Sequence, residues 1–509
     1  MSSRHLETER TYELAGAGVP DLVAGTDAVI ASVDDLGTVQ LEATYVDTAD
    51  LSLLARRVTL RRRLGGDDAG WHLKLPPEDD TRQEVHWPLG AYSEIPAAVQ
   101  HTVTSLVLGR SLQPVVSLAT TRHRSVLRTD DGTPLAEVCD DRVAATVLLD
   151  RPAGSRAPAA ESVTVWREIE VELMAGDEAV LDLVHDALLA AGAQPSAYAS
   201  KLARALAEHV MPAPPLPADH DSGSAGAVVL EYLHEDLEAL RAADLSWRLD
   251  EDGDGVHDLR VQARRLRTAL AVYRPIFDEQ IARRLQGDLT QLGRELSMQR
   301  DLRVERAELL QTLDGQDTQV TGSVAELAER RRSSDDATAR AATRTALASR
   351  RYVELLTDLE ALTSGAALSP VAGQPATSVL PGLLRRAHDR LRRRARRAQE
   401  AAVPEERREA LHDLRKSAKR LRYASEAAEP ALGKDVRRLR KRAARVQSDL
   451  GHHGDAHALA GWLYELSRAD GVDAHVGFAL GALHAAQLEA AQEAERSAAR
   501  SVRRLLAIG

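Results

Sequence analysis

The 509-residue sequence has little of what a secreted or membrane-embedded protein needs. Cys139 is the only cysteine, which excludes an intramolecular disulfide and a cysteine-rich zinc site and is typical of a reducing cytoplasm. No uninterrupted apolar run reaches the roughly 18 residues of a membrane-spanning helix. Residues Met1 to Arg10 carry charges where a signal peptide would be apolar. We therefore expect a cytoplasmic protein without a membrane partner.

Aromatic residues are also scarce, at 3% of the chain, so the core must consist mainly of Ala, Leu and Val, which favours helices. The formal net charge of −11 disfavours a polyanion partner, but the charges are unevenly distributed. Residues 385–445 contain 22 Lys or Arg against 9 Asp or Glu, whereas residues 231–254 are acidic. A local excess of positive charge attracts anions whatever the sum over the chain.

The length exceeds what one hydrophobic core supports and predicts two to four domains. Residues 3–208 contain alternating apolar and polar runs separated by Gly and Asp clusters, which predict strands. Residues 209–225 are rich in Pro, Gly, Ser and Asp and are predicted to be a linker. Residues 226–507 have a helical period and few glycines. We therefore predict an α+β multidomain protein with an all-helical C-terminal half.

The helical half contains an internal repeat. The segment VHDLRVQARRLRTAL from Val256 returns as LHDLRKSAKRLRYAS from Leu411, 155 residues later. Each copy has about the length of a four-helix bundle. The repeat predicts two four-helix bundles, at about residues 226–365 and 378–507.

Charged side chains at a spacing of two recur on the predicted strands, and residues at this spacing share one face. A solvent-exposed face would explain any single pair, but the opposite faces of the same strands are apolar. A closed barrel with a charged lumen and helices outside explains both faces. The recurring groups are Glu7 and Glu9, Arg61 and Arg63, Arg82 and Glu84, Arg122 and Arg124, Glu137 and Asp141, and Glu168, Glu170 and Glu172.

Such a lumen segregates cations from carboxylates. Arginines and Lys74 would hold phosphate oxygens, while the carboxylates would hold Mg2+ or Mn2+ bridging to the same phosphates. A chain of three or more phosphates fits a tunnel better than a single phosphate does.

Five segments together resemble the CYTH family, the triphosphate tunnel metalloenzymes. They are HLETER, TYVDTADLSLLARRVTLRRR, WHLKLP, REIEVEL and ASKLARAL. The resemblance covers residues 3–208 and implies a closed antiparallel β-barrel with flanking helices around a triphosphate tunnel. It implies catalytic roles for Glu7, Glu9 and Lys74. It implies that metal is held by Glu7, Glu9, Glu170 and Glu172, and substrate by Arg61, Arg63, Lys74, Arg122, Arg124 and Lys201.

One position departs from the family pattern. Thr11 stands where the first-strand motif has a lysine that assists catalysis, which weakens the expectation of hydrolysis but not of binding. Arg10 is not a substitute, because adjacent residues of a strand point to opposite faces.

Each copy of the helical repeat carries a cationic stripe opposite an apolar face. On one helix His257, Arg260, Arg264 and Arg267 fall within a narrow arc, and His412, Arg415, Lys419 and Arg422 reproduce the stripe in the second copy. A solvated basic face is the alternative explanation. Such faces usually interleave Glu with Lys or Arg, however, and like charges repel unless an anion is bound. The stripes therefore predict a polyanion-binding surface.

The two stripes resemble the CHAD family, whose members bind inorganic polyphosphate. QRDLRV from Gln299 and SDLGHHGDAHAL from Ser448 resemble the motif that follows each histidine helix, with Gly454 where arginine is usual. His452, His453 and His457 lack a third strong metal ligand and are interpreted as a polar helix segment. The resemblance implies that polyphosphate is bound by His257, Arg260, Arg264, Arg267, Arg300, His412, Arg415, Lys416, Lys419, Arg420 and Arg422, with Arg265 at the flank.

Together the segments predict a CYTH-CHAD protein with either of two functions. The first is binding of inorganic polyphosphate, including at polyphosphate granules, with a triphosphate or chain end held in the barrel with Mg2+ or Mn2+. The second is metal-dependent hydrolysis of tripolyphosphate or an organic triphosphate in the barrel. The shortage of aromatic residues disfavours nucleic acid, because single strands bind by base stacking. Nothing in the sequence favours cyclisation of ATP, another activity of the CYTH family.

Overall fold

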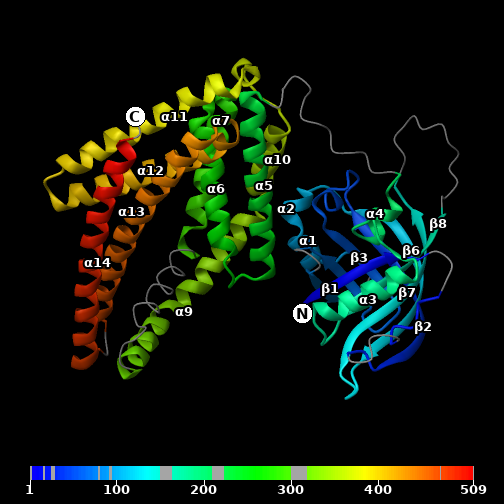
Figure 1. Cartoon of the computed structure of the whole chain (residues 1–509). Helices are drawn as coiled ribbons and strands as arrows, with labels where there is room; N and C mark the ends of the chain where they lie inside the picture. Colours follow the sequence, from blue (N-terminus) through cyan, green and yellow to red (C-terminus); the bar gives the residue numbers. More distant parts are fainter. Residues whose placement is uncertain are drawn as a thin grey trace. The chain divides into compact units, whose positions relative to one another are not determined.

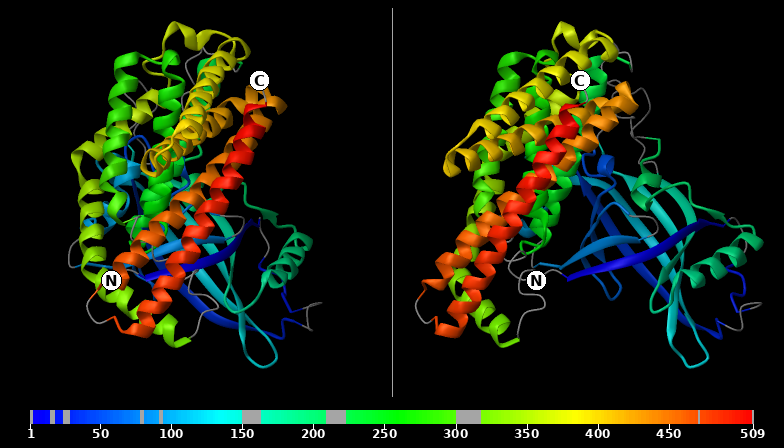
Figure 2. Two further views of the ribbon diagram at one scale, coloured as in Figure 1. Left: turned by 90° about the vertical axis from the view of Figure 1, so that its left-hand side faces the viewer. Right: turned by 60° about the vertical axis from the view of Figure 1, so that its left-hand side comes forward.

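The structure, a computed structural model, consists of two compact units, Met1–Pro214 and Pro215–Gly509. It is drawn in Figures 1 and 2. The residues that the structure describes are 3–14, 18–23, 29–77, 81–90, 94–149, 163–208, 223–299, 318–469 and 472–507.

The first unit is a closed antiparallel barrel. Its strands follow the order β5-β4-β3-β2-β6-β7-β8-β1, and pairing of β1 with β5 closes the ring. A short β9 pairs with the end of β1. The strands are β1 (Ser3–Glu13), β2 (Ser32–Asp47), β3 (Thr59–Leu64), β4 (Gly70–Lys74), β5 (Thr81–Pro88), β6 (Gln113–Arg128), β7 (Pro134–Val147), β8 (Val163–Leu173) and β9 (Gln194–Pro195). The predicted closed barrel is confirmed.

The apolar faces of the strands lie outside the barrel under helices, as alternation requires. Val138 and Val171 of β7 and β8 pack with Val180 and Leu188 of α3 in one buried cluster. This cluster fixes the strand register, since a slip of one residue would turn the charged face toward α3. The helices of this unit are α1 (Ala97–Thr102), α2 (Thr104–Val107), α3 (Glu178–Ala190) and α4 (Lys201–Ala205), with a 3-10 turn at Leu54–Arg56.

One end of the lumen is filled by apolar side chains. The lumen-facing rows of β7 and β8 change here from carboxylates to Val143 and Trp166, and α4 packs on these residues through Leu202 and Ala205. Ser200 caps the N-terminus of α4. Its Oγ accepts a hydrogen bond from the backbone N–H of Ala203 at 3.1 Å. The cap and the apolar contacts hold the first residue of α4 at the closed end of the charged lumen.

The second unit is helical and contains the predicted repeat. Helices α5 to α10 form the first copy, and α11 to α14 form the second, in which α13 and α14 run side by side in both figures. Ser349, which caps the N-terminus of α10, separates α10 from α9. The helices are α5 (Ala225–Leu249), α6 (Gly255–Val272), α7 (Glu279–Glu295), α9 (Thr318–Ala348), α10 (Arg350–Thr363), α11 (Ala376–Glu400), α12 (Pro404–Leu432), α13 (Lys434–Ser467) and α14 (Ala474–Leu506).

Arg265 of α6 links the two copies. Its guanidinium donates to Asp236 of α5 at 2.7 Å and to both carboxylate oxygens of Glu426 of α12 at 3.1 Å. The rings of Tyr232 and Tyr423 lie within 5.1 and 5.3 Å of the same group. Because its charge is compensated on both sides, Arg265 joins the repeats rather than extending the cationic stripe.

Among the helices in the described parts of the chain, none combines the length and the apolar character required to cross a bilayer.

Candidate functional site

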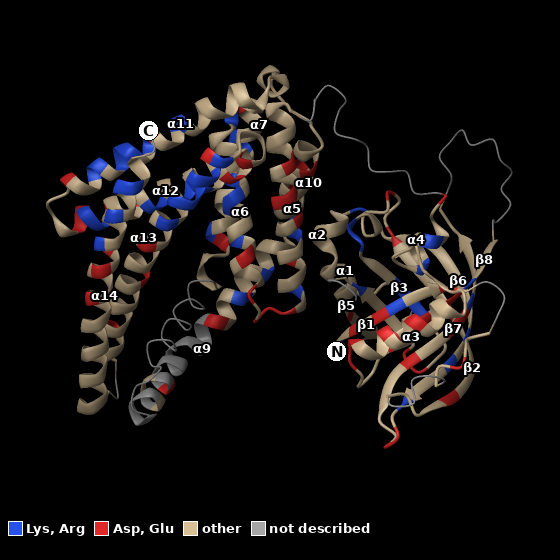
Figure 3. Cartoon of the chain, viewed as in Figure 1, with Lys and Arg blue, Asp and Glu red and all other residues tan. Residues whose placement is uncertain are grey.

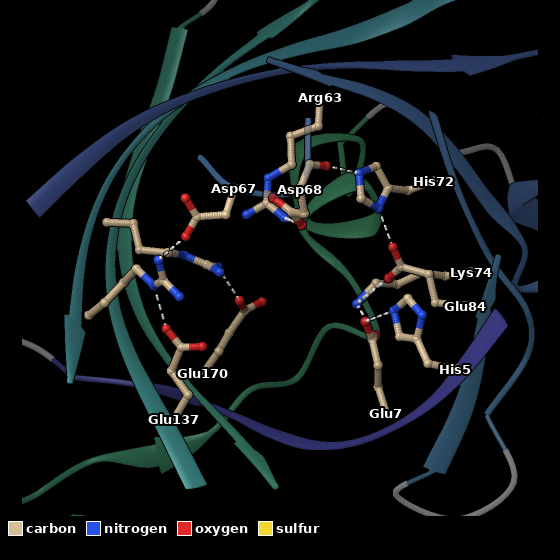
Figure 4. A network of polar contacts seen from close by, with 12 residues as sticks. His5, Glu7, Arg63, Asp67, Asp68, His72, Lys74, Glu84, Glu137 and Glu170 are labelled. Carbon is tan, nitrogen blue, oxygen red and sulfur yellow. Dashed lines mark hydrogen bonds and ion pairs between the residues drawn. The ribbon is translucent and has the colours of Figure 1, made fainter. Parts of the chain in front are cut away.

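The middle of the barrel lumen is lined by charged side chains from almost every strand. Figure 4 looks into this ring and shows the labelled side chains pointing into the lumen, with carboxylates joined to neighbouring cations. All six cations predicted to hold substrate lie on this inner surface or at its closed end. Their partners divide the lumen into three clusters.

The first cluster surrounds Lys74 of β4. Its Nζ lies 2.7 Å from Glu7, 3.6 Å from Glu9 and 3.3 Å from Glu84. Burial by itself would lower the pKa of Lys74, but the three carboxylates raise it overall, so the ammonium stays charged. Glu84 also bonds His72, and the pKa of Glu84 falls despite its burial because of His72 and Lys74. The first strand and the lysine strand are thus joined by ion pairs.

The second cluster is centred on Asp141, which is fully buried. Arg122 donates two hydrogen bonds to this carboxylate, at 2.8 and 2.6 Å, and also bonds Glu170. Lys201, the first residue of α4, reaches Asp141 at 3.0 Å and Glu168 at 2.6 Å and bonds Glu170 as well. Lys201 therefore contacts three carboxylates from the closed end of the lumen.

The third cluster lies away from α4, where the β3–β4 turn meets β6 and β7. Gly65 and Gly66 both have positive φ and so allow a tight turn. The next two residues are brought back to the barrel wall: Asp68 accepts from Arg63 at 2.5 Å, and Asp67 accepts from Arg124 at 3.1 Å. Arg124 also donates to Glu137 at 2.5 Å. Arg61 lies between the clusters. Burial lowers its pKa, but the neighbouring Tyr45 and Glu84 raise it overall.

The carboxylates predicted to hold a divalent ion lie on the adjacent strands β1 and β8. Glu9 and Glu172 are direct partners across these strands, and Glu7 and Glu170 are the next inward-facing residues on either side. Burial, with a smaller contribution from Glu7, raises the pKa of Glu172 to about 7. Like charges opposed across a ladder are destabilising unless a cation or protons neutralise them. Hard oxygen donors in this number suit Mg2+ or Mn2+, so the residues fit the implied ion.

Ligand atoms approach one another most closely in two other groups of the described chain. These are His5, Glu7 and Glu84, and Asp141, Glu168 and Glu170, each within 4.8 Å. Both groups already contain a lysine among their carboxylates, Lys74 and Lys201 respectively. A divalent ion there would have to displace an ammonium group, and so would an ion held by Glu7 and Glu170, which contact the same two lysines.

Several lumen residues were missed by the sequence analysis. His72 shares the inward face with Lys74 by the same spacing of two, so this signal was available. Asp67 and Asp68 were assigned only to a turn, and no local pattern indicates that the turn folds back over the lumen. Arg82, noted for its spacing, lies 3.7 Å from Glu9 and lines the cavity beside it.

The position of Thr11 is as predicted. It faces the lumen opposite Glu170 in the β1–β8 register, and it lines the cavity that also contains Lys74 and Lys201. Arg10 points away and pairs with Asp182 of α3 at 2.7 Å.

In the helical unit, the predicted stripes lie on α6 and α12. His257 and His412 are exposed at the start of each stripe, and the arginines that follow are half-buried. Arg267 approaches Thr290 and Arg422 approaches Gln447, both at 3.4 Å, which are long and neutral contacts. Arg267 and Arg422 thus differ from Lys74, Arg122 and Lys201 of the lumen, which each have carboxylates at short range.

The two stripes converge where the repeats meet. Burial, followed by the charges of Arg390 and Arg267, lowers the pKa of Arg420. Arg267 is affected in the same way by Arg264 and Arg294. A concentration of positive charge therefore spans α6, α7, α11 and α12, and Figure 3 shows Lys and Arg along α6, α11 and α12. In the sequence analysis, the cations of α11 appeared only as part of the local excess of Lys and Arg and were not assigned to a stripe.

A cavity of about 600 Å³ lies beside the second stripe, lined by α12 and α13. His412 and Arg415 face it together with His453 and His457 of α13, whose rings are 4.7 Å apart. A Cβ on Gly454 would lie only 3.3 Å from Nη1 of Arg415. Glycine at position 454, where the motif usually has arginine, therefore leaves room for the guanidinium group of Arg415.

Other predicted polyphosphate ligands are placed less distinctively. Lys416 is exposed and lies 3.6 Å from Asp413, and Arg415 lies 3.5 Å from Asp455. Lys419 is half-buried on the same helix. Arg300 lies outside the described residues.

Comparison with known proteins identifies both units. A CYTH domain is matched over residues 19–205 and a CHAD domain over residues 231–464. The chain is a two-domain protein in which a CYTH domain precedes a CHAD domain. It belongs to the same family as "Uncharacterized protein Rv2226" of Mycobacterium tuberculosis (strain ATCC 25618 / H37Rv), to which it is 32% identical over 518 residues, covering 99% of this chain and 97% of the relative.

A second strain gives the same result. "Uncharacterized protein MT2285" of Mycobacterium tuberculosis (strain CDC 1551 / Oshkosh) is also 32% identical over 99% of this chain and 97% of its own length. Among solved structures, PptA from Streptomyces chartreusis is similar with 20% identity and a TM-score of 0.45, over 55% of this chain and 99% of that one. The CHAD domain from the plant Ricinus communis matches with 28% identity and a TM-score of 0.41, over 53% and 91%.

The Asp141 cluster predicts a difference between adjacent residues. Asp141→Asn would leave Arg122 and Lys201 buried beside an amide, and we expect the barrel to lose about 3–5 kcal/mol. The measurement is the free energy of opening of β6 and β7 from hydrogen exchange of their amides in the full-length protein.

Asp140→Asn is the matched control. This carboxylate faces the outside of the same strand and pairs with Arg167 at 2.7 Å, with both side chains about a fifth exposed. It should cost about 1 kcal/mol or less. Equal losses in the two variants would contradict the assignment of Asp141 to a buried, charge-balanced centre.

Proposed function

We propose that the protein binds inorganic polyphosphate, with long chains on the helical domain and a triphosphate segment or chain end in the barrel together with Mg2+ or Mn2+. The observation that carries this proposal is the presence of two cationic arrays, one in a closed lumen and one across the repeats of the helical domain. The arrays differ in how their charge is balanced, and each difference suits one mode of binding.

In the lumen, every ion pair has both of its partners within the protein. A complex of phosphate with a divalent ion carries both signs of charge. Its phosphate oxygens can pair with the cation of each ion pair in the protein, and its metal ion can pair with the carboxylate. The phosphate oxygens would take Arg61, Arg63, Arg122, Arg124, Lys74 and Lys201, and the ion would take the carboxylates. Neither partner alone would leave the lumen balanced, because an unpaired buried charge is costly.

The proposed ion site consists of Glu7, Glu9, Glu170 and Glu172. When bound there, the ion would supply positive charge to the phosphate oxygens. The raised pKa of Glu172 supports the assignment, since it comes first from burial and then from the charge of Glu7, and a bound cation would offset both. Lys74 would turn from Glu7 toward the phosphate when the ion arrives, as its three carboxylate contacts are spread over 2.7 to 3.6 Å.

Thr11 favours binding over hydrolysis. The hydroxyl group of Thr11 carries no positive charge, so it cannot act as the amine of a lysine does. Arg10 is paired with Asp182 outside the barrel. The second candidate function, metal-dependent triphosphate hydrolysis, is supported by the catalytic candidates Glu7, Glu9 and Lys74, which lie in one cluster. The barrel has the parts to hold a triphosphate but lacks the lysine associated with catalysis.

On the helical domain, several cations lie close to other cations. Arg264, Arg267 and Arg420 lie close enough to one another to influence each other's charge, which costs stability in the absence of an anion. A long polyphosphate carries one negative charge or more on each phosphate and would neutralise the whole band. The distribution over four helices and two repeats suits an extended chain.

Polyphosphate affinity is expected to depend on the stripes. Changing His257, Arg260, His412 and Arg415 together to Ala should weaken binding of long-chain polyphosphate by at least about 100-fold, because several charge-assisted hydrogen bonds are lost. Equilibrium dialysis of the full-length protein against polyphosphate at fixed salt measures this loss.

A control variant should remove more positive charge from the same domain without touching the stripes. It changes four exposed, ion-paired arginines of α7 and α10 to Ala: Arg283, Arg284, Arg350 and Arg351. We expect less than about a threefold change. A comparable loss in both variants would mean that polyphosphate responds to total charge and not to the stripes.

Thr11→Lys is expected to convert the binding tunnel into a faster hydrolase. The new amine would enter the lumen opposite Glu170, and release of phosphate from tripolyphosphate with Mn2+ should rise by about 100-fold. Thr8→Lys, on the outer face of the same strand, should leave the rate unchanged. Rapid release by the unmodified protein would instead support the hydrolase function.

Ion binding is expected to strengthen from pH 6 to pH 8. With a pKa of about 7, Glu172 is mostly protonated at pH 6 and must lose this proton to hold an ion. The electron paramagnetic resonance signal of free Mn2+ reports its binding, and affinity should rise by about tenfold over this range. Glu172→Gln should remove most of the dependence, whereas Glu178→Gln on α3 should keep it. An unchanged slope in Glu172→Gln would exclude this carboxylate.

A further inference from the structure

A second cavity adjoins the lumen at the end closed by α4. It has a volume of about 530 Å³, far larger than the narrow space of about 40 Å³ left between the side chains of the lumen. The two spaces adjoin one another, since both are lined by Glu9, Thr11, Arg82, Ser196 and Tyr198. A guest in the lumen therefore has room to continue past Thr11.

The connection follows from the pairing of β1. Among the described residues, β1 pairs with β5 as far as Thr8 and with β9 from Tyr12 onward. The segment between these pairings borders the cavity on that side, while its other edge stays paired with β8. A lysine at Thr11 would project into this passage, so the small side chain keeps it open.

Three arginines line the second cavity. Arg10 pairs with Asp182 at 2.7 Å, and Arg82 is 3.7 Å from Glu9 and 3.3 Å from the carbonyl oxygen of Ala199. Arg57 is exposed and has no hydrogen bond or ion pair from its side chain to any described residue. It is the cation of this cavity that is available to a ligand.

The backbone of Arg57 is unusual for an arginine. Its φ is 59° and ψ 25°, the left-handed conformation that ends the 3-10 turn Leu54–Arg56. Glycine or asparagine would adopt this conformation at lower cost, so the turn itself gives no reason for arginine. The conformation places a long cationic side chain on the wall of the cavity.

We propose that this cavity binds the phosphates that follow the tunnel-bound segment of a linear polyphosphate, so that the barrel takes longer chains in preference to free tripolyphosphate. This inference rests on the proposed function of the barrel. Arg57 is the first contact of the emerging chain, and Arg82 lies between lumen and cavity. The barrel is then a site for the interior or end of a long chain, not for a small triphosphate.

An organic group attached to a triphosphate is the competing occupant. The exposed aromatic ring of the cavity is that of Tyr198, which is 38% exposed and already lies 5.6 Å from the guanidinium of Arg204. The ring of His185 lies against Tyr12, whose hydroxyl is 3.2 Å from its Nδ1. No pair of facing rings is formed by the described lining residues, whereas a free cation is present. The wall therefore favours phosphate.

The test measures displacement of labelled tripolyphosphate from the full-length protein in the presence of Mn2+. The part of the binding that Lys74→Ala removes defines the barrel site. Linear octaphosphate should displace this part at a free concentration at least about tenfold lower than tripolyphosphate does, because it gains charge-assisted hydrogen bonds. Arg57→Gln should abolish most of this advantage without changing displacement by tripolyphosphate itself.

Two further variants make the result specific. Arg142→Gln removes the same charge from the exposed outer face of β7 and should keep the full advantage. Arg57→Gly is compatible with the left-handed backbone and should fold at least as well as the unmodified protein, yet lose the advantage as Arg57→Gln does.

The outcomes separate the two levels of the argument. If Lys74→Ala removes no tripolyphosphate binding, the proposed function of the barrel fails. If it does, but the octaphosphate advantage is absent or survives in both Arg57 variants, the inference about the second cavity fails alone. Displacement by ATP at lower concentration than by octaphosphate would overturn the inference in favour of an organic group.

Discussion

The fold of the barrel depends on the mutual neutralisation of buried charges. Lys74, Arg122 and Lys201 are each held by two or more carboxylates at short range, so the charges that strand pairing brings into the closed ring are compensated within it. Such a centre contributes little net stability compared with an apolar core, since desolvation offsets much of the attraction. Its presence is best explained by a guest that also carries both signs of charge.

The helical domain uses the opposite arrangement. Carboxylates compensate Arg265, and that residue joins the two repeats, whereas the neighbouring stripe residues Arg267 and Arg422 have only long contacts to neutral oxygens. One helix thus carries cations of two kinds within a single turn. The compensated cation holds the copies together, and the uncompensated ones form the surface between them.

Local sequence patterns located the functional faces well. Spacing by two assigned Glu7, Glu9, Arg122 and their counterparts to the inner wall, and the confirmed barrel places them there. The same rule could have added His72. It could not find Asp67 and Asp68, because their position depends on two glycines folding the β3–β4 turn back over the lumen. The 155-residue repeat revealed two bundles but not that their stripes meet.

The sequence by itself determined the two-domain architecture, the inward face of each strand and the cationic face of each repeat, because these follow from periodicity along the chain. Only the tertiary structure decided which charges are paired, that Arg265 links the repeats, and that a second cavity, lined by Arg57, adjoins the lumen at Thr11. The physical reason is that charge compensation and cavities are set by contacts between strands and helices distant in sequence, and no local period encodes those distances.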